Sequence, residues 1–268
     1  METPLLNIVS NAKGEKFKLS PWLALAVVIV IASLMSHHTR LFVLLMLLAT
    51  LSHTLFLSGL AIGGLLAGVP IQGFRMFFGP ELVSGYIGEA KIGIGCIPLG
   101  GYVQVKGMGA VTEGEISAAD DFRELSRLRR LSIFITGPVL LLVLASLCIG
   151  PVGVGNSFVR AFYQYVAGSI QPLTQGQILL DKLAELLKTG NWPLALGIIA
   201  SKMAALSLFP LGGNTTNSLL DQVNEDDTRE SVFYKGYRRA GTIVIIILSL
   251  GWLIAGTVYL YHIVLGNQ

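Results

Sequence analysis

The sequence has little charge and little cysteine. Only 13% of its 268 residues are Asp, Glu, Lys or Arg, whereas 53% are hydrophobic. This composition lies outside the range of ordinary water-soluble domains and is typical of a membrane protein. The two cysteines, Cys96 and Cys148, form neither a disulfide framework nor a CxxC pair. We therefore expect a membrane protein whose fold does not depend on disulfides.

Basic blocks, histidine pairs and serine motifs are also missing. No basic run is interleaved with aromatic residues and the net charge is only +3, so nucleic-acid binding is not expected. No two of the four histidines are spaced i, i+3 or i, i+4, the spacing with which one helix face binds a metal. A Gly-x-Ser-x-Gly elbow is absent too. The histidines are His37, His38, His53 and His262.

Long apolar runs, in contrast, are plentiful. A membrane span needs about 20 mostly apolar residues. Five segments are candidates: residues 21–35, 41–68, 131–150, 192–211 and 241–265. The first is short, but its polar lead-in, which contains Glu2 and Glu15 as well as lysines, and the lack of a small-x-small cleavage site favour a retained signal-anchor over a cleaved signal peptide. We predict an α-helical membrane protein with about five transmembrane helices.

The basic residues predict the orientation of these helices. If residues 1–20 face the cytoplasm, alternation of the spans places residues 69–130 and 212–240 there as well. The cytoplasmic segments then hold 14 Lys and Arg residues, and the outer segments hold 4. Cytoplasmic loops carry an excess of Lys and Arg. We therefore expect a cytoplasmic N-terminus and, after five spans, a C-terminus on the outer side.

The segment between the second and third helices has a different character. Residues 69–130 contain the run "AKIGIGCIPLGGYVQVKG", in which strand-forming residues are broken by glycines and one proline. This pattern predicts a small Gly-rich β insertion with tight turns. The chain would then consist of a cytoplasmic segment at 1–20, an additional helix at 21–40, and a membrane domain at 41–268 that includes the insertion. Later, "GQILLDKLAELLK" has helical apolar spacing and predicts a helix that packs on the bundle or lies on the membrane surface.

Four short motifs occur in a recognisable order. They are "FFGPEL" at 77–82, "IPLGGYV" at 97–103, "FRELSRLRRLSIFITGPVL" at 122–140 and "SLFPL" at 207–211. In order and spacing they resemble the site-2 protease family (peptidase family M50), the membrane-embedded zinc metalloproteases. The resemblance covers roughly residues 41 to 265. Together with the orientation above, it implies an integral protein of a prokaryotic cytoplasmic membrane.

The resemblance also implies a zinc site, for which the sequence lacks the ligands. The second helix would carry His-Glu-x-x-His, and a later Leu-Asp-Gly segment would add an Asp. Aligned without gaps back from "LLAGVPI", the pentapeptide falls on Phe56, Leu57, Ser58, Gly59 and Leu60. A register moved by three residues puts His53 at the first ligand position but leaves Thr54 as the base. Counting on from Ser207, which stands where the family has Asn, the Asp position falls on Thr215.

Phe and Leu cannot ligate a metal, and Thr is a poor zinc ligand. We therefore expect no metal cofactor and interpret the chain as a pseudoprotease that binds or regulates a transmembrane client or an active protease within the bilayer. The insertion would align an extended peptide by strand addition. The sequence gives no indication of oligomeric state. The candidate client-binding residues are His53, Pro98, Gly100, Gly101, Tyr102, Val103 and Asn214.

Two alternatives remain open. One is an active intramembrane metalloprotease with an atypical metal site that uses His53 and acidic residues of the insertion. The other is a small transporter or a lipid-handling protein. Lys202, the one charge within its apolar run, would snorkel, pair across the bundle or contact a partner. Gly59 with Gly63, and Gly64 with Gly68, form two small-xxx-small spacings, which favour close helix packing within the chain or with a partner.

Overall fold

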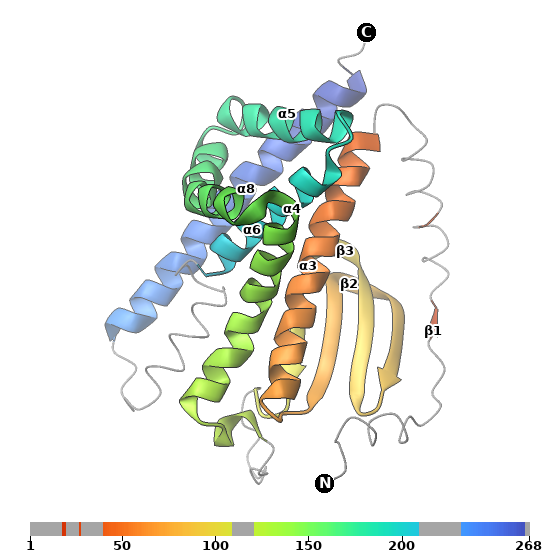
Figure 1. Ribbon diagram of the computed structural model, residues 1–268, viewed down its shortest axis with the longest axis vertical. Helices are drawn as coiled ribbons and strands as arrows, with labels where there is room; N and C mark the ends of the chain where they lie inside the picture. The colour runs from red at the N-terminus through yellow and green to blue at the C-terminus, as the bar shows by residue number, and fades with distance from the viewer. Residues whose placement is uncertain (1–17, 20–26, 28–39, 109–120, 209–231, 266–268) are drawn as a thin grey trace. The chain divides into compact units, whose positions relative to one another are not determined.

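The protein is mostly helical and contains one small sheet (Figure 1). The computed structural model describes residues 18–19, 27, 40–108, 121–208 and 232–265. Its helices are α3 (Arg40–Leu66), α4 (Arg127–Ile170), α5 (Gln175–Lys188), α6 (Trp192–Ser207) and α8 (Val232–Leu265). The other elements are β1 (Lys18–Leu19), β2 (Ile71–Ile87), β3 (Ala90–Val105) and the short 3-10 helix η1 (Phe122–Glu124). The predicted class, helical with a β insertion between the second and third predicted helices, is confirmed.

Three of the described helices are long and apolar enough to cross a membrane. They are Val43–Leu66, Arg127–Ile170 and Arg239–His262. The predicted segment at 192–211 is present as α6, which is apolar but shorter than a span. The predicted segment at 21–35 lies almost entirely outside the described residues. The prediction of a membrane-embedded helical protein therefore holds, and its helices α3, α4 and α8 lie where the apolar runs placed them.

Helix α4 contains a break at the place where the predicted third span ends. Gly150 has φ 70° and ψ 162°, which is not a helical conformation, and Pro151 follows it. Proline removes a backbone donor and clashes with the preceding turn, so a helix seldom passes through it without a kink. The chain nevertheless continues in helical form to Ile170. This second part of α4 was not predicted.

The described chain divides into two compact units. Unit 1 comprises Met1–Ile29 and Phe56–Gly137, and unit 2 comprises Val30–Leu55 and Pro138–Gln268. Unit 1 contains the sheet together with the adjoining parts of α3 and α4. Unit 2 contains α5, α6, α8 and the remainder of α3 and α4.

The sheet of unit 1 follows the order β1-β2-β3. Residues 73–76 of β2 have partners on both sides, because they pair with residues 91–94 of β3 and also with residues 101–104 of β3. The second half of β2 pairs with the start of β3, from Val83 opposite Ile94 to Ile87 opposite Ala90. On the far side of that half, β1 pairs with Val83 and Ser84. The insertion is therefore a folded-over hairpin whose inner segments, paired on both sides, are residues 73–76 and 91–94.

Unit 2 is held together by close helix contacts and a few polar bonds. The buried Ser201 of α6 donates a hydrogen bond to the Val154 carbonyl of α4 over 3.2 Å. Trp252 of α8 stacks on Tyr165 of α4, with ring centroids 6.4 Å apart and planes at 15°. The indole Nε1 also donates to the Tyr165 carbonyl over 2.9 Å. These contacts tie α6 and α8 to the second half of α4.

Candidate functional site

The segment of α3 from Phe56 to Leu60, where the zinc motif would align, is an apolar packing surface. Leu57 is only 2% exposed. Gly59 faces the backbone of α4 so closely that an added Cβ would lie 2.7 Å from the Cα of Gly137. At Gly137, an added Cβ would lie 3.0 Å from the ring of Phe56. Small residues of this kind let two helices approach to backbone contact.

The same glycine row continues toward the end of α3. An added Cβ at Gly63 would lie 2.9 Å from the Cα of Ile133 on α4. At Gly64 it would lie 2.9 Å from Val105 and 3.1 Å from Ile71, both in the sheet. Figure 1 shows the sheet alongside this half of α3. Gly59 and Gly63 thus pack on α4 and Gly64 packs on the sheet, so the small-residue spacing serves packing within the chain.

The residues of this segment do not fit a zinc ion. The side chains of Phe56, Leu57 and Leu60 contain no nitrogen, oxygen or thiolate donor, which is what zinc requires. Within the described parts of the chain, no group of three or more His, Cys, Asp and Glu residues is placed to hold a metal. The positions Asn214 and Thr215 lie outside the described residues. No catalytic step through a metal is therefore derived for this segment.

The candidate client-binding residues of the insertion stand together on one segment of β3. Within the described residues, positions 101–104 pair with β2 on one side, and no strand pairs with their other side. Tyr102 is 44% exposed, while Val105 at the end of the same segment is 1% exposed. Gly100, with φ 71°, adopts the left-handed conformation where this segment begins. We call residues 101–105 the open edge.

The other candidate residues are less informative. Pro98 belongs to β3, but its side chain lies outside the description. His53 belongs to unit 2 and is partly buried on α3. Its neighbour Ser52 is completely buried and donates to the Leu48 carbonyl over 3.0 Å, a local bond within the helix. The structure therefore groups Gly100, Gly101, Tyr102 and Val103 on one segment of β3, whereas His53 belongs to the other unit.

An ionic cluster fixes the corner of the hairpin. Lys91 Nζ lies 2.7 Å from Glu81 Oε1, and Arg75 Nη1 lies 3.7 Å from the same oxygen. Arg75 also donates to the Gly79 carbonyl. The hydrogen bond from Lys91 lowers the pKa of Glu81 and raises that of Lys91. Nearby, Phe77 and Gly79 have φ values of 64° and 84°, which marks the predicted Gly-Pro turn as a sharp corner within β2.

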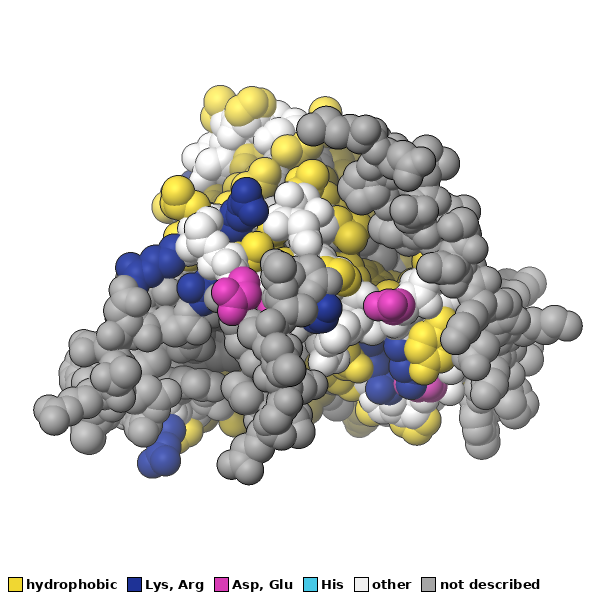
Figure 2. Space-filling model, turned by 90° about the horizontal axis from the view of Figure 1, so that it is seen from below, with side chains coloured by type: hydrophobic (Ala, Val, Ile, Leu, Met, Phe, Trp, Pro, Cys, Tyr) yellow, Lys and Arg dark blue, Asp and Glu magenta, His cyan; other side chains and the backbone are white. Residues whose placement is uncertain are grey.

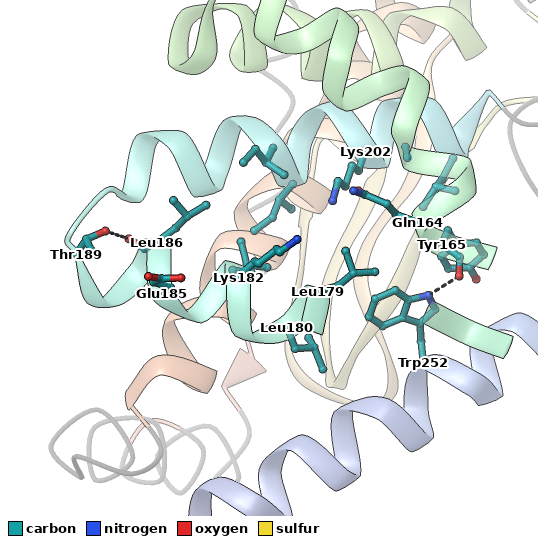
Figure 3. A pocket seen from close by; sticks show the side chains of 15 residues that line it. Gln164, Tyr165, Leu179, Leu180, Lys182, Glu185, Leu186, Thr189, Lys202 and Trp252 are labelled. Carbon is teal, nitrogen blue, oxygen red and sulfur yellow. Dashed lines mark hydrogen bonds between the residues drawn. The ribbon is translucent and has the colours of Figure 1, made fainter. Parts of the chain in front are cut away.

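Functional candidates that the sequence analysis missed line a cavity of about 650 Å³ in unit 2 (Figure 3). Among them are Gln164 of α4 and Lys182 of α5, which lie near Lys202. Lys202 is the one residue of this cavity that the sequence analysis singled out, because it is a charge inside an apolar run. Lys182 gave no signal because a lysine on an amphipathic helix ordinarily faces solvent.

These features define an integral membrane protein with a β insertion inserted between two closely packed helices. The profile of Peptidase family M50 matches residues 41–264. The chain therefore belongs to peptidase family M50, the site-2 protease family.

Similar proteins come from bacteria. The chain is 32% identical over 123 residues to a "Putative zinc metalloprotease" of Chlamydia pneumoniae, covering 42% of this chain and 20% of that protein. It is 28% identical over 120 residues to a protein of the same description from Chlamydia trachomatis, covering 41% and 19%. A third such protein, from Clostridium acetobutylicum, is 34% identical over 91 residues, covering 33% and 25%. The matched region thus spans 19–25% of the length of each relative.

Proposed function

We propose that this chain is a non-catalytic member of peptidase family M50 that holds a transmembrane client, or an active protease of the family, through its β insertion. The observation that carries the proposal is the packing of α3 at residues 56–60. The aligned ligand and base positions there are Phe56, Leu57 and Leu60, and the Gly59 backbone is in contact with Gly137. This segment forms an apolar packing surface at the positions where a zinc site would require nitrogen, oxygen or sulfur ligands.

The open edge supplies the binding surface. A strand edge presents unpaired backbone N–H and C=O groups, and an extended peptide can add to it as a further strand. Here Tyr102 is exposed on that edge, and Val105 anchors its end in the interior of unit 1. In strand addition the client is bound mainly through hydrogen bonds to its backbone, so this mode of binding needs no catalytic residues.

The membrane arrangement that goes with this function has five spans. It adds the apolar segment at 21–35 and α6 to the three long helices, with the N-terminus in the cytoplasm of a prokaryotic cell and the C-terminus outside. The bacterial relatives and the excess of basic residues in the segments assigned to the cytoplasm support it. Helix α4 begins at the lower end of Figure 1, and Figure 2, which looks at that end, shows Lys and Arg side chains there.

Metal content tests the non-catalytic part of the proposal. The protein is purified from membranes without chelator, and zinc per chain is measured by mass spectrometry of the elements. We expect far less than one zinc per chain, unchanged in His53→Ala. One zinc per chain in the unaltered protein that is lost in His53→Ala would instead establish a metal site that uses His53. That result would overturn the proposal.

Crosslinking tests the binding part. A photo-reactive phenylalanine analogue replaces Tyr102 on the open edge, and the same analogue replaces Tyr86 on β2 as the control. Both tyrosines are 44% exposed, so unspecific labelling should be equal. We expect position 102 alone to crosslink a membrane protein through an extended segment, identified by peptide mapping. Equal products at both positions, or none at 102, would contradict strand addition at this edge.

A further inference from the structure

A cavity lies between the helices of unit 2. It has a volume of about 650 Å³ and is lined by residues of α4, α5, α6 and α8, with one residue beyond α5. Ligand sites in proteins commonly measure about 300–1,000 Å³. The cavity is therefore large enough to hold an acyl chain with its head group.

Most of the lining is apolar. Leu179 and Leu183 come from α5, and Ile198, Ile199 and Leu206 come from α6. Trp252 of α8 adds an aromatic surface beside Tyr165 (Figure 3). Apolar surface of this kind is stabilised when it is covered by hydrocarbon rather than by water. The walls therefore favour an occupant with an aliphatic part.

One part of the cavity is cationic. Figure 3 shows the amino groups of Lys182 and Lys202 and the amide of Gln164 pointing toward one another from α5, α6 and α4. Neither lysine forms a hydrogen bond or an ion pair with any described residue. The carboxylate of Glu185 lies toward the other end of the cavity in the same view. Lys202 is partly buried, whereas Lys182 is exposed. A partly buried ammonium group without a counter-charge is costly in apolar surroundings, and an anion held between the two lysines removes that cost.

Gln164 adds a hydrogen-bonding requirement. Its side-chain oxygen Oε1 is buried and has no hydrogen-bond partner within the described structure. An unsatisfied buried acceptor is costly, and a donor on a bound molecule would remove that cost. The occupant should therefore offer negative charge and a hydroxyl or protonated oxygen beside it.

We propose that this cavity binds an anionic amphiphile, with its phosphate or carboxylate head group between Lys182 and Lys202 and its acyl chain along the apolar walls. A membrane phospholipid and a free fatty acid share this chemistry. The site belongs to unit 2 and does not depend on the non-catalytic function proposed above.

Trp252 provides a direct reporter, because brominated chains quench tryptophan fluorescence on contact. The chain has three tryptophans, so the double variant Trp22→Phe/Trp192→Phe retains Trp252 alone. This variant is reconstituted in vesicles that contain brominated phosphatidylglycerol or brominated phosphatidylcholine at equal mole fraction. We expect phosphatidylglycerol to quench about threefold more effectively, the size of a few favourable charge contacts. Equal quenching by the two lipids would overturn the proposal.

Charge variants locate the effect. Lys182→Gln/Lys202→Gln should abolish the preference, whereas Lys188→Gln, which changes a lysine of the same helix outside the cavity lining, should leave it intact. A preference that survives the double change would overturn the proposal. If the double variant does not fold, the quenching preference is measured at increasing salt concentration on the protein that retains both lysines. The preference should decline as ionic strength rises.

Two further arms identify the source of the anion. Dibrominated stearic acid added to phosphatidylcholine vesicles should also quench Trp252 if a free fatty acid is accepted, and only phosphatidylglycerol should do so if the site requires a phospholipid. Inorganic phosphate at matched ionic strength should displace neither. Displacement by inorganic phosphate would show that the acyl chain is not recognised and would contradict an amphiphile site.

Discussion

Gly59 of α3 and Gly137 of α4 meet backbone to backbone, so that a single added Cβ at Gly59 would lie 2.7 Å from the Gly137 Cα. The contact involves the fourth residue of the pentapeptide Phe56–Leu60, which was aligned with the zinc motif. The helices thus pack closely at a segment whose side chains are mostly apolar.

The first prediction concerns this contact. Gly59→Ala should destabilise the protein by about 1–3 kcal/mol, because an over-packed site forces the helices apart. Thermal unfolding in detergent measures the effect as a fall of several degrees. Gly256→Ala on α8 is the matched control, since an added Cβ there meets no atom within 4 Å. Equal melting temperatures for the two variants would show that α3 and α4 are not in contact at Gly59.

The second prediction concerns Leu57, the residue at the position of the general base. Because Leu57 is 2% exposed, Leu57→Glu places a carboxylate without a partner in an apolar site. We expect a loss of about 3–5 kcal/mol. Leu57→Met, which nearly preserves volume, should cost less than about 1.5 kcal/mol. Denaturant unfolding in detergent compares them, and a well-tolerated Glu would reveal polar surroundings at this position.

The third prediction concerns pH. The hydrogen bond from Lys91 lowers the pKa of Glu81 below its ordinary 4.5, so the unfolded chain binds this proton more tightly than the folded one. The stabilisation is therefore present above about pH 4.5 and is lost as pH falls through the lowered value. Glu81→Gln should reduce the melting temperature at pH 7 by about 1–2 °C and flatten its decline between about pH 5 and 3. Exposed Glu89→Gln on the same hairpin is the control, and an equal effect there would contradict a specific role of Glu81.

The fourth prediction concerns Trp252. Trp252→Phe keeps an aromatic ring against Tyr165 but removes the 2.9 Å hydrogen bond to its carbonyl. The net loss should be about 1 kcal/mol, the ordinary value of one such bond. Trp192→Phe changes a tryptophan that is 45% exposed and should have no measurable effect on thermal unfolding in detergent. A neutral Trp252→Phe would mean that α8 is not held to α4 by this pair.

Much of the fold follows from local sequence signals. The apolar run at 41–68 predicts α3 almost to its ends, and the glycines and β-branched residues of 69–130 predict the insertion. The break at Gly150 was predicted as a helix end. The continuation from Pro151 to Ile170 was missed because proline and glycine weaken a helix locally, whereas contacts such as Ser201 with the Val154 carbonyl stabilise it from another helix.

The candidate site was predictable in its chemistry but not in its geometry. The side chains of Phe56 and Leu57 contain no donor atom, so their identity alone shows that they are not metal ligands. Among the described residues, 101–104 pair on one side only, which is a property of strand register and depends on side-chain packing across the sheet. The approach of Lys182 to Lys202 depends on how α5 and α6 pack, and no spacing within one segment encodes it.

The double pairing of residues 73–76 bears on the order of events during synthesis. Every pairing between β2 and β3 joins residues within the stretch 71–105, and Gly64 of α3, which packs against that sheet, precedes it. Contacts that are close in sequence form early, and hairpins close in about 1–10 µs. The sheet can therefore be complete on the end of α3 while α4 is still being translated, with its open edge available to a neighbouring chain during that interval.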